Sequence, residues 1–328
     1  MASLLLEIQD LHLSFDLYRR SLNVLDGVAI AVAEGEKVGI VGETGCGKSI
    51  TMKAMMGILP IPPARIAQGQ IQFNGRDLLT LTKKEMREVR RREMSFIPQD
   101  PSASLNPVLR VGTQLIDVIR YSGNIQKPLS KREARRRAIN ILREVGLPDP
   151  QRNMRSYPIQ LSGGMQQRIL ISMALATGAI LLIADEPSTA LDVTIQDQIL
   201  RLMRELVERR GVSIVIITHN LGVVRELTDR TYVMYAGQVV ENVKTKQLFA
   251  EQIGSMHPYT QGLLDSIPRM TGEGVTAGIR GMIPDYADPP SGCRFRPRCD
   301  RAMPICETRP PAFHVEEGHN IACHLYEG

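Results

Sequence analysis

The sequence predicts an α/β protein with a parallel sheet covered by helices on both faces, and a small irregular module at the C-terminal end. Three observations predict it. A short apolar strand, residues 37–41, leads into a glycine-rich loop. Two continuous apolar runs, residues 180–184 and 212–217, are flanked by helical patterns, which is typical of buried parallel strands. Seven prolines fall between Pro284 and Pro311 and argue against regular structure there.

The composition is that of a globular protein. With 328 residues the chain is long enough for about two domains, or for one large domain with an extension. A net charge of +5 is too small and dispersed to predict nucleic-acid binding. The N-terminal residues lack the basic region of a signal peptide, and no apolar run reaches the ~18 residues of a membrane span. We therefore expect a protein that is soluble or peripheral to a membrane.

Short patterns place the elements in order. The N-terminal half is expected to be antiparallel in places, with strands and turns at residues 11–15, Asp26-Gly27 (turn), 28–32, 71–73 and Asn74-Gly75 (turn). From about residue 80 to Leu147 the pattern is helical throughout. Ser130 and Glu133 predict a capping box, in which Glu133 reaches back to the Ser130 amide. The arginines that follow are interpreted as a solvated helix face. Another helix is expected over residues 195–209.

A phosphate-binding loop follows the first parallel strand. The motif G-x-x-x-x-G-K-[ST] is formed by Gly42, Glu43, Thr44, Gly45, Cys46, Gly47, Lys48 and Ser49. Its glycines let successive amides turn inward and form an anion nest, and the next helix adds its N-terminal dipole. Lys48 is expected to reach the β- and γ-phosphates of ATP, and Ser49 to supply a hydroxyl to Mg²⁺. The strand–loop–helix context disfavours a chance glycine loop.

Two acidic residues end the strand at residues 180–184. Asp185 is expected in the Mg²⁺ shell, and Glu186 is expected to orient or deprotonate an attacking water. Alone this pattern is weak, because acids often follow strands. The phosphate loop upstream gives it weight.

A second anion site is predicted at the segment Leu161–Arg168. Ser162 is a helix N-cap candidate, and Gly163 and Gly164 expose backbone amides. With this segment the sequence resembles the ATP-binding-cassette (ABC) family. The resemblance implies a P-loop NTPase fold with a RecA-like core, an antiparallel β subdomain and a helical subdomain. It also implies that two chains sandwich two nucleotides, with the signature of one chain closing on the ATP of the other.

The resemblance implies roles for further positions. Gln99 resembles the glutamine that senses Mg²⁺ and transmits to a membrane partner. Residues 188–192 resemble a dimer-contact loop. His219 resembles the histidine that contacts the γ-phosphate. For the aromatic residue that stacks on adenine, Phe15 and Tyr18 compete; we favour Tyr18, because Phe15 shares the core-facing alternation of its strand.

The C-terminal part resembles the di- and oligopeptide importer subfamily, which also serves nickel. The similarity is carried by residues 234–241, residues 257–260 and a four-cysteine segment, with Asn242-Val243 departing from the usual glycine turn. It implies an ATPase that energises di-/oligopeptide uptake from the cytoplasmic face of the membrane. The implied partners are a homologous second ATPase, two membrane permeases and an extracytoplasmic solute-binding protein, without nucleic acid. The expected domains are residues 1–260, with a helical subdomain at about 100–178, and residues 261–328.

Four of the five cysteines lie close to the C-terminal end. The spacing of Cys293, Cys299, Cys306 and Cys323 decides neither for zinc nor for an iron–sulfur cluster. The resemblance implies a [4Fe–4S] cluster. Unligated cysteines are disfavoured, because a segment so rich in proline has little else to hold it. Three nearby arginines are expected to offset the charge of the cluster: Arg294, Arg296 and Arg298.

Some alternatives stay open. The chain could be a soluble ATPase whose cysteine module binds nucleic acid, or an importer ATPase for a non-peptide solute such as nickel. Cys46 is interpreted as a small residue that fits the loop. The helix N-terminus would favour its thiolate, and if Cys46 lines the site, its alkylation should block ATP binding.

Overall fold

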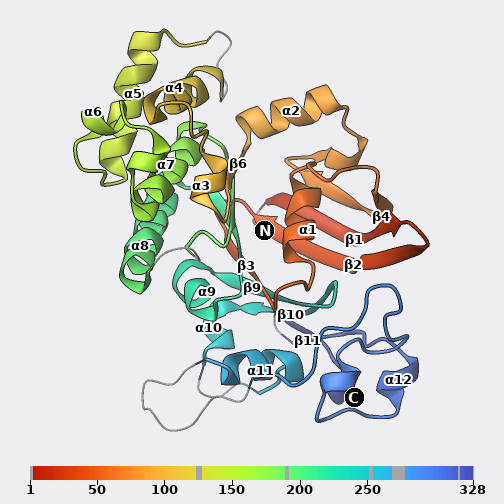
Figure 1. Ribbon diagram of the computed structural model, residues 1–328. Coiled ribbons are helices and arrows are strands. Elements are labelled where there is room, and N and C mark those ends of the chain that lie inside the picture. Colours follow the sequence, from red (N-terminus) through yellow and green to blue (C-terminus); the bar gives the residue numbers. More distant parts are fainter. Residues whose placement is uncertain are drawn as a thin grey trace. The chain divides into compact units, whose positions relative to one another are not determined.

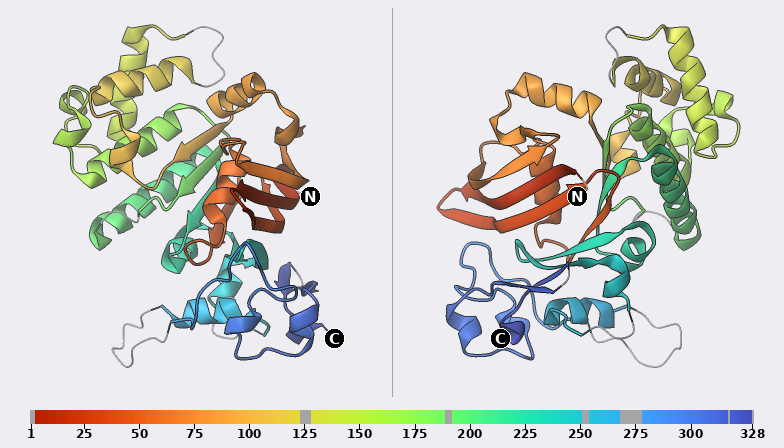
Figure 2. Two further views of the ribbon diagram at one scale, coloured as in Figure 1. Left: turned by 45° about the vertical axis from the view of Figure 1, so that its right-hand side comes forward. Right: turned by 180° about the vertical axis from the view of Figure 1, so that it is seen from behind.

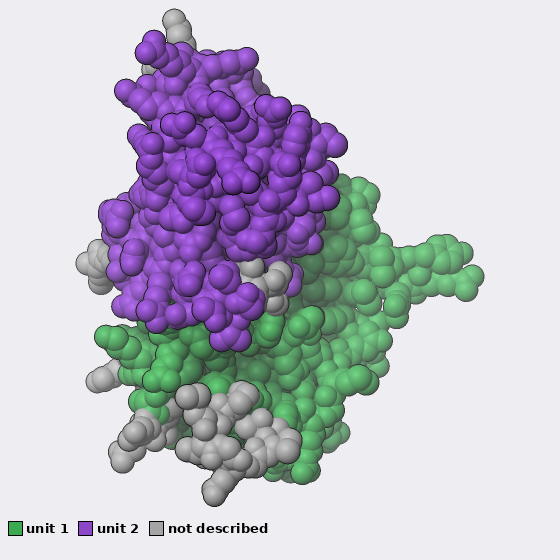
Figure 3. Space-filling view, turned by 60° about the vertical axis from the view of Figure 1, so that its left-hand side comes forward, with its two compact units in different colours: residues 1–80, 217–328 green, residues 81–216 purple. Residues whose placement is uncertain are grey.

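The computed structural model describes residues 3–122, 128–188, 192–250, 254–267, 278–316 and 318–327. It divides into two compact units (Figure 3): unit 1 comprises residues 1–80 and 217–328, and unit 2 comprises residues 81–216. Each unit is described by itself. Within the described ranges, every helix is too short or too polar to span a membrane.

Unit 1 begins with an antiparallel sheet. Its strand order is β2-β1-β4-β5, with bounds β1 (Leu4–Leu17), β2 (Arg20–Ala33), β4 (Ala64–Phe73) and β5 (Arg76–Asp77). The turn predicted at Asp26-Gly27 is wrong, because β2 continues through both residues. Gly27 has φ +67° there, and the register against β1 shifts nearby, between Leu11 and Leu13. The glycine thus marks an irregularity in the strand and not a turn. The turn at Asn74-Gly75 is confirmed.

The remaining strands of unit 1 form a second sheet. Their order is β11-β12-β10-β9-β3, and only β3 and β9 are parallel. The bounds are β3 (Lys37–Val41), β9 (Arg230–Tyr235), β10 (Gln238–Lys244), β11 (Phe313–Glu316) and β12 (His319–Ala322). The C-terminal segment thus adds two strands to the edge at β10, as the blue strands of Figure 1 show.

The helices of unit 1 are short. They are α1 (Lys48–Met55), α9 (Leu221–Leu227), α10 (Thr245–Leu248), α11 (Pro258–Asp265) and α12 (Ile305–Thr308), with 3₁₀ turns at Leu78–Thr80, Arg296–Arg298 and His324–Tyr326. Residues 284–311 contain only such short helical turns, as the prolines predict. Figure 2 shows this part as a series of loops around α12.

Unit 2 is predominantly helical. Its helices are α2 (Lys83–Arg92), α3 (Pro101–Ser104), α4 (Val111–Tyr121), α5 (Lys131–Glu144), α6 (Pro150–Asn153), α7 (Gly163–Ala176) and α8 (Val193–Arg210), with a 3₁₀ turn at Pro158–Gln160. Its strands lie in the order β8 (Ser213–Thr218), β7 (Leu181–Asp185), β6 (Met94–Ile97). The last two residues of β8 already belong to unit 1.

Two expectations for unit 2 need correction. Strand β6 lies inside the stretch, from about residue 80 to Leu147, for which the sequence pattern predicts helix. Its four residues are too few to show a period against the helical patterns on either side. At α5, Ser130 accepts the Glu133 amide at 3.2 Å, but the Glu133 carboxylate bonds Arg136 and Arg137. Because the Glu133 carboxylate bonds these two guanidinium groups, it does not accept the Ser130 amide that a capping box requires.

Candidate nucleotide site

The phosphate loop lies between β3 and α1, as the sequence predicts. Val38, Ile40 and Val41 of β3 are buried, so the strand is fixed in the core and ends at the loop. Gly42 has φ +152°, and a side chain there would overlap the Met234 carbonyl oxygen. Only glycine fits this start of the loop.

Lys48 begins α1, and its side chain reaches back to the start of the loop. Its side chain is buried, and Nζ donates to the carbonyl oxygens of Gly42 (2.7 Å) and Glu43 (2.9 Å). The ammonium is therefore held where an inward-turned loop would present it to phosphate oxygens. Ser49, the next residue of α1, is exposed, as are Thr44 and Gly45.

Cys46 does not line an open site. Its thiol is fully buried, and burial raises the pKa of Cys46 despite the nearby Lys48. The expectation that the helix N-terminus favours the thiolate is therefore wrong, because loss of solvation outweighs the positive charge. The backbone of Cys46 serves the loop: its carbonyl accepts the Gly237 amide at 2.8 Å.

In unit 2 the structure brings Gln99 and Glu186 together. The Gln99 side-chain amide donates to the Glu186 carboxylate at 3.1 Å. The cause is the parallel pairing of β6 with β7, which matches Ile97 with Ala184. The two side chains follow neighbouring strands at the same edge of the sheet. Glu186 has φ +45°, a left-handed conformation that a non-glycine residue adopts at a cost of about 1–3 kcal/mol.

Asp185 ends β7 and is buried, with 9% of its surface exposed. Of the expected dimer-contact loop at residues 188–192, residues 189–191 lie outside the described residues. Ser188 is buried, and Asp192 caps α8 by accepting the Ile195 amide at 3.0 Å.

The signature segment begins α7 as predicted. Ser162 accepts the Met165 amide at 3.4 Å, and both Ser162 and Gly163 are exposed. Gly164 packs against Ile195, where a side chain would collide with a methyl group of the isoleucine. The N-terminal end of a 14-residue helix is thus open to an anion.

The other predicted residues lie in unit 1. His219 is exposed and directly follows β8. Tyr18 lies in the turn between β1 and β2 with 87% of its surface exposed, whereas Phe15 is half-buried within β1. The difference in exposure agrees with the choice of Tyr18.

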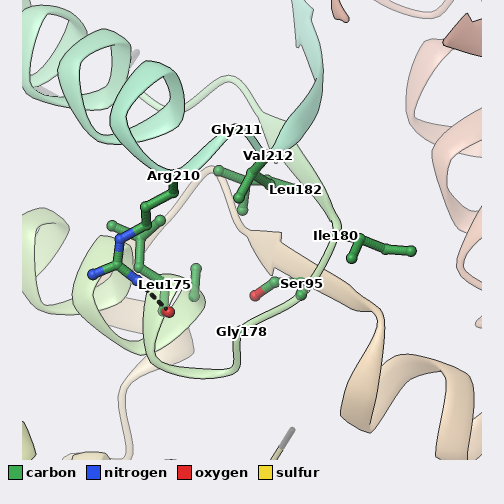
Figure 4. A pocket seen from close by; sticks show the side chains of 10 residues that line it. Ser95, Leu175, Gly178, Ile180, Leu182, Arg210, Gly211 and Val212 are labelled. Atoms are coloured by element: carbon green, nitrogen blue, oxygen red, sulfur yellow. Dashed lines mark hydrogen bonds between the residues drawn. The ribbon is translucent and has the colours of Figure 1, made fainter. Parts of the chain in front are cut away.

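A hollow in unit 2 lies away from these residues (Figure 4). It has a volume of about 240 Å³ and is lined by Ser95, Leu182, Arg210 and their neighbours. Arg210 donates to the Leu175 carbonyl at 2.9 Å across it. The chain enters β7 near this hollow, whereas Asp185 and Glu186 lie where β7 ends. Because open α/β sheets bind ligands at the carboxyl ends of their strands, the hollow is not the nucleotide site.

The cysteine segment is held by more than its cysteines. Phe295 is buried and contacts the rings of Tyr235 (5.1 Å), Tyr259 (5.5 Å) and His257 (5.7 Å between centroids). The Tyr326 hydroxyl donates to the Met256 carbonyl at 2.8 Å. The expectation that the proline-rich segment has little else to hold it is wrong, because an aromatic core and a strand pairing anchor it.

The arginines near the cysteines also differ from expectation. Arg294 pairs with Asp26 at 3.0 Å, Arg296 with Glu307 at 2.9 Å, and Arg298 with Glu43 at 2.7 Å. The positive charge of each arginine is therefore balanced by a carboxylate of the protein, and no cluster is needed to balance it. The sequence offers no sign of these pairs, since two of them join residues more than 200 positions apart.

The four thiols interact electrostatically. Burial and the other three thiols raise the pKa of Cys323 to about 11. Burial likewise raises the pKa of Cys293 and of Cys299. Among the residues that the structure describes, no three Cys, His, Asp or Glu side chains are arranged to hold a metal ion.

Three contacts to the phosphate loop leave no pattern in the sequence. The Tyr259 hydroxyl accepts the Glu43 amide at 2.8 Å, the Tyr286 hydroxyl donates to the Gly45 carbonyl at 2.7 Å, and Arg298 bonds the Glu43 carboxylate. The same is true of Gln167, which donates to the Pro187 carbonyl at 2.7 Å and so ties α7 to the segment after the acids.

Comparison with known proteins agrees with this arrangement. Residues 25–189 match the family described as ABC transporter, and residues 240–306 match the oligopeptide/dipeptide transporter C-terminal region. Similar relatives include the oligopeptide transport ATP-binding protein AppD of Bacillus subtilis (44% identity over 99% of this chain and 98% of the relative). Another is OppD of Salmonella typhimurium (42%; 98% of this chain and 94% of the relative).

Solved structures agree too. The dimeric ATP-binding cassette MJ0796 bound to ADP and Pi has a TM-score of 0.65 and 26% identity, covering 73% of this chain and 98% of that one. The structure of cbiO1 from Clostridium perfringens has a TM-score of 0.63 and 26% identity, covering 76% and 92%. The fold and the phosphate loop thus define an ABC-type nucleotide-binding domain with ATPase activity. The chain belongs to the ABC transporter family, among the ATP-binding subunits that carry the oligopeptide/dipeptide transporter C-terminal region.

Proposed function

We propose that this chain hydrolyses ATP to energise the uptake of di- and oligopeptides by an ABC importer. The observation that carries the proposal is the C-terminal match at residues 240–306, on a chain that aligns over almost its whole length with peptide transport subunits. The proposed partners are a second, homologous ATPase, two membrane permeases and an extracytoplasmic solute-binding protein. The chain lies peripherally at the cytoplasmic face of the membrane. Residues 1–260 form the ATPase domain, with a helical subdomain at about 100–178, and residues 261–328 form the extension.

ATP binds with its phosphates in the loop from Gly42 to Ser49. The loop amides and the N-terminus of α1 hold the phosphates, and Lys48 turns from the loop carbonyls to the β- and γ-phosphate oxygens. Tyr18 stacks on adenine. His219 contacts the γ-phosphate.

The proposed ligands of Mg²⁺ are oxygen donors. The Ser49 hydroxyl, the Asp185 carboxylate and the Gln99 amide oxygen are the ligand types that this ion prefers. Because the Gln99 amide nitrogen bonds Glu186, its oxygen is the atom left for coordination. When bound, Mg²⁺ neutralises charge on the phosphate oxygens.

Glu186 accepts a proton from the attacking water. The bond from Gln99 orients the carboxylate for this step. In the closed dimer, Ser162, Gly163 and Gly164 of one chain present the N-terminus of α7 to the ATP held by the other. Closure and reopening of this sandwich move the permeases.

Replacing Glu186 with Gln tests the assignment of the base. The variant should bind ATP as the wild type does, while turnover falls by ~10²–10⁴-fold, the usual contribution of a general base. Turnover at the wild-type rate would contradict the role. Glu205, an exposed residue of α8, offers a control with the same chemical change: Glu205→Gln should change neither quantity.

We also propose that Cys293, Cys299, Cys306 and Cys323 hold a [4Fe–4S] cluster, with zinc as the alternative. Cysteine thiolates are the usual ligands of such clusters, and the matched oligopeptide/dipeptide transporter C-terminal region, residues 240–306, contains three of these four cysteines. Among the described residues no three Cys, His, Asp or Glu side chains are arranged to hold a metal ion, so the four cysteine side chains would have to come closer together to ligate the cluster. When bound, the cluster would cross-link four points of the C-terminal segment.

Metal analysis of anaerobically purified protein tests the cluster. The proposal expects about four irons and four sulfides per chain with a broad visible absorption. One zinc per chain and no colour would replace the cluster by a zinc site. The nucleic-acid alternative is not favoured, because Arg294, Arg296 and Arg298, which lie beside the cysteines, each pair with a carboxylate.

A further inference from the structure

Two side chains of the C-terminal extension, Arg298 and Tyr286, and Tyr259 of α11 contact the phosphate loop at its second and fourth residues. The Arg298 guanidinium forms two parallel hydrogen bonds with the Glu43 carboxylate, at 2.7 and 2.9 Å. The Tyr259 hydroxyl accepts the amide of the same Glu43 at 2.8 Å. The Tyr286 hydroxyl donates to the Gly45 carbonyl at 2.7 Å. All these residues belong to unit 1.

Arg298 is fixed before it meets the loop. Its Nε donates to the Arg280 carbonyl at 2.7 Å, and its guanidinium lies 5.6 Å from the centroid of the Tyr235 ring. The side chain of Arg298 is 4% exposed and that of Glu43 is 28% exposed. A two-pronged, charge-assisted pair with so little exposure is stronger than an ordinary surface ion pair.

We propose that Arg298 is a positioning residue for ATP: through Glu43 it holds the phosphate loop in the shape that receives the phosphates. The inference rests on the proposed nucleotide role of the loop. An anion nest works only while its amides point inward. If the loop holds that shape for a fraction of the time, the observed Kd rises by the inverse of that fraction. The C-terminal segment, although it adds no group to the phosphates, thereby sets the affinity for ATP.

The test compares full-length variants in MgATP binding and in steady-state hydrolysis. For Arg298→Gln we expect the Kd and the KM for ATP to rise about tenfold, or ~1.4 kcal/mol, with kcat within about twofold. Arg298→Lys keeps the positive charge but cannot form the two parallel hydrogen bonds. Its Kd should lie between those of the wild type and Arg298→Gln. Tyr286→Phe removes the hydrogen bond to the Gly45 carbonyl and leaves the Arg298–Glu43 pair intact. It should raise the Kd for MgATP about threefold.

The matched control is Arg296→Gln. Arg296 lies in the same 3₁₀ turn and pairs with Glu307 at 2.9 Å, away from the loop. The Arg296→Gln variant should leave the Kd for MgATP unchanged. Thermal unfolding without nucleotide shows whether each variant is folded. In a double-mutant cycle, Glu43→Gln with Arg298→Gln should be no weaker in binding than either single variant.

The outcomes are distinguishable. An unchanged or tighter Kd in folded Arg298→Gln or Tyr286→Phe would overturn the inference and leave the proposed function intact. An equal effect of Arg296→Gln would overturn it too, because the effect would then come from the segment as a whole. Failure of the wild type to bind MgATP would instead overturn the proposed nucleotide site.

Discussion

Replacing Phe295 with Ala tests what anchors the C-terminal segment. Phe295 is 4% exposed, and its ring contacts Tyr235, Tyr259 and His257. Emptying such a site removes the burial of a phenyl ring and leaves a cavity, which costs about 3–5 kcal/mol. The lost aromatic pairs, at about 0.5–1.5 kcal/mol each, place the expected value toward the upper end of this range.

Equilibrium unfolding in denaturant measures this cost, and limited proteolysis locates it. Phe295→Ala should lower the free energy of unfolding by about 3–5 kcal/mol and expose residues 284–311 to cleavage. The control is Phe313→Ala in the same segment, where the ring is 45% exposed, and the loss should stay below ~1 kcal/mol. If Phe295→Ala lowers the free energy of unfolding by less than ~1 kcal/mol, packing of Phe295 does not anchor the segment. The cysteines would then be the remaining anchor.

Three further predictions follow from burial and backbone geometry. Burial lowers the pKa of His257 to about 3, whereas a histidine in the unfolded chain has a pKa near 6.5. Between these two pH values the unfolded state binds one proton more than the folded state. The free energy of unfolding should therefore decrease by up to ~1.4 kcal/mol for each pH unit below pH 6.5. In His257→Asn, unfolding measured from pH 7 to 5 should lose this slope, and an unchanged slope would contradict it. Iodoacetamide should leave Cys46 unmodified in the native protein, as mass mapping can check, because its thiol is fully buried; fast alkylation without unfolding would show that the thiol is open. Gly42→Ala should abolish ATP binding in a titration, since its methyl group collides with the Met234 carbonyl; wild-type affinity would mean that the loop relaxes freely.

The sequence predicts the elements that a short pattern determines. Strand β3, the phosphate loop and α1 follow from one motif, and Ser162 from its place before two glycines. Strand β6 escapes prediction, since its four residues carry no period of their own. Yet β6 is what brings Gln99 to Glu186.

Long-range pairs escape prediction for a different reason. The contact of Arg298 with Glu43 joins residues 255 positions apart. The sequence around either residue gives no indication of which residue it pairs with. The anchoring of the C-terminal segment escapes prediction for the same reason: prolines and cysteines are visible in the sequence, but the segment is held by Phe295 and by the pairing of β12 with β10. Composition describes what a segment contains and not what it packs against.

Uptake of a labelled dipeptide by cells shows whether this ATPase energises peptide import. Cells that lack the chain would be supplied with the wild type or with Glu186→Gln, both at equal abundance, and uptake would be followed over time. We expect the wild type to restore uptake and Glu186→Gln not to restore it, although the variant still binds ATP. Uptake that is equal with the wild type, with the variant and without the chain would contradict the claim that this ATPase energises peptide import.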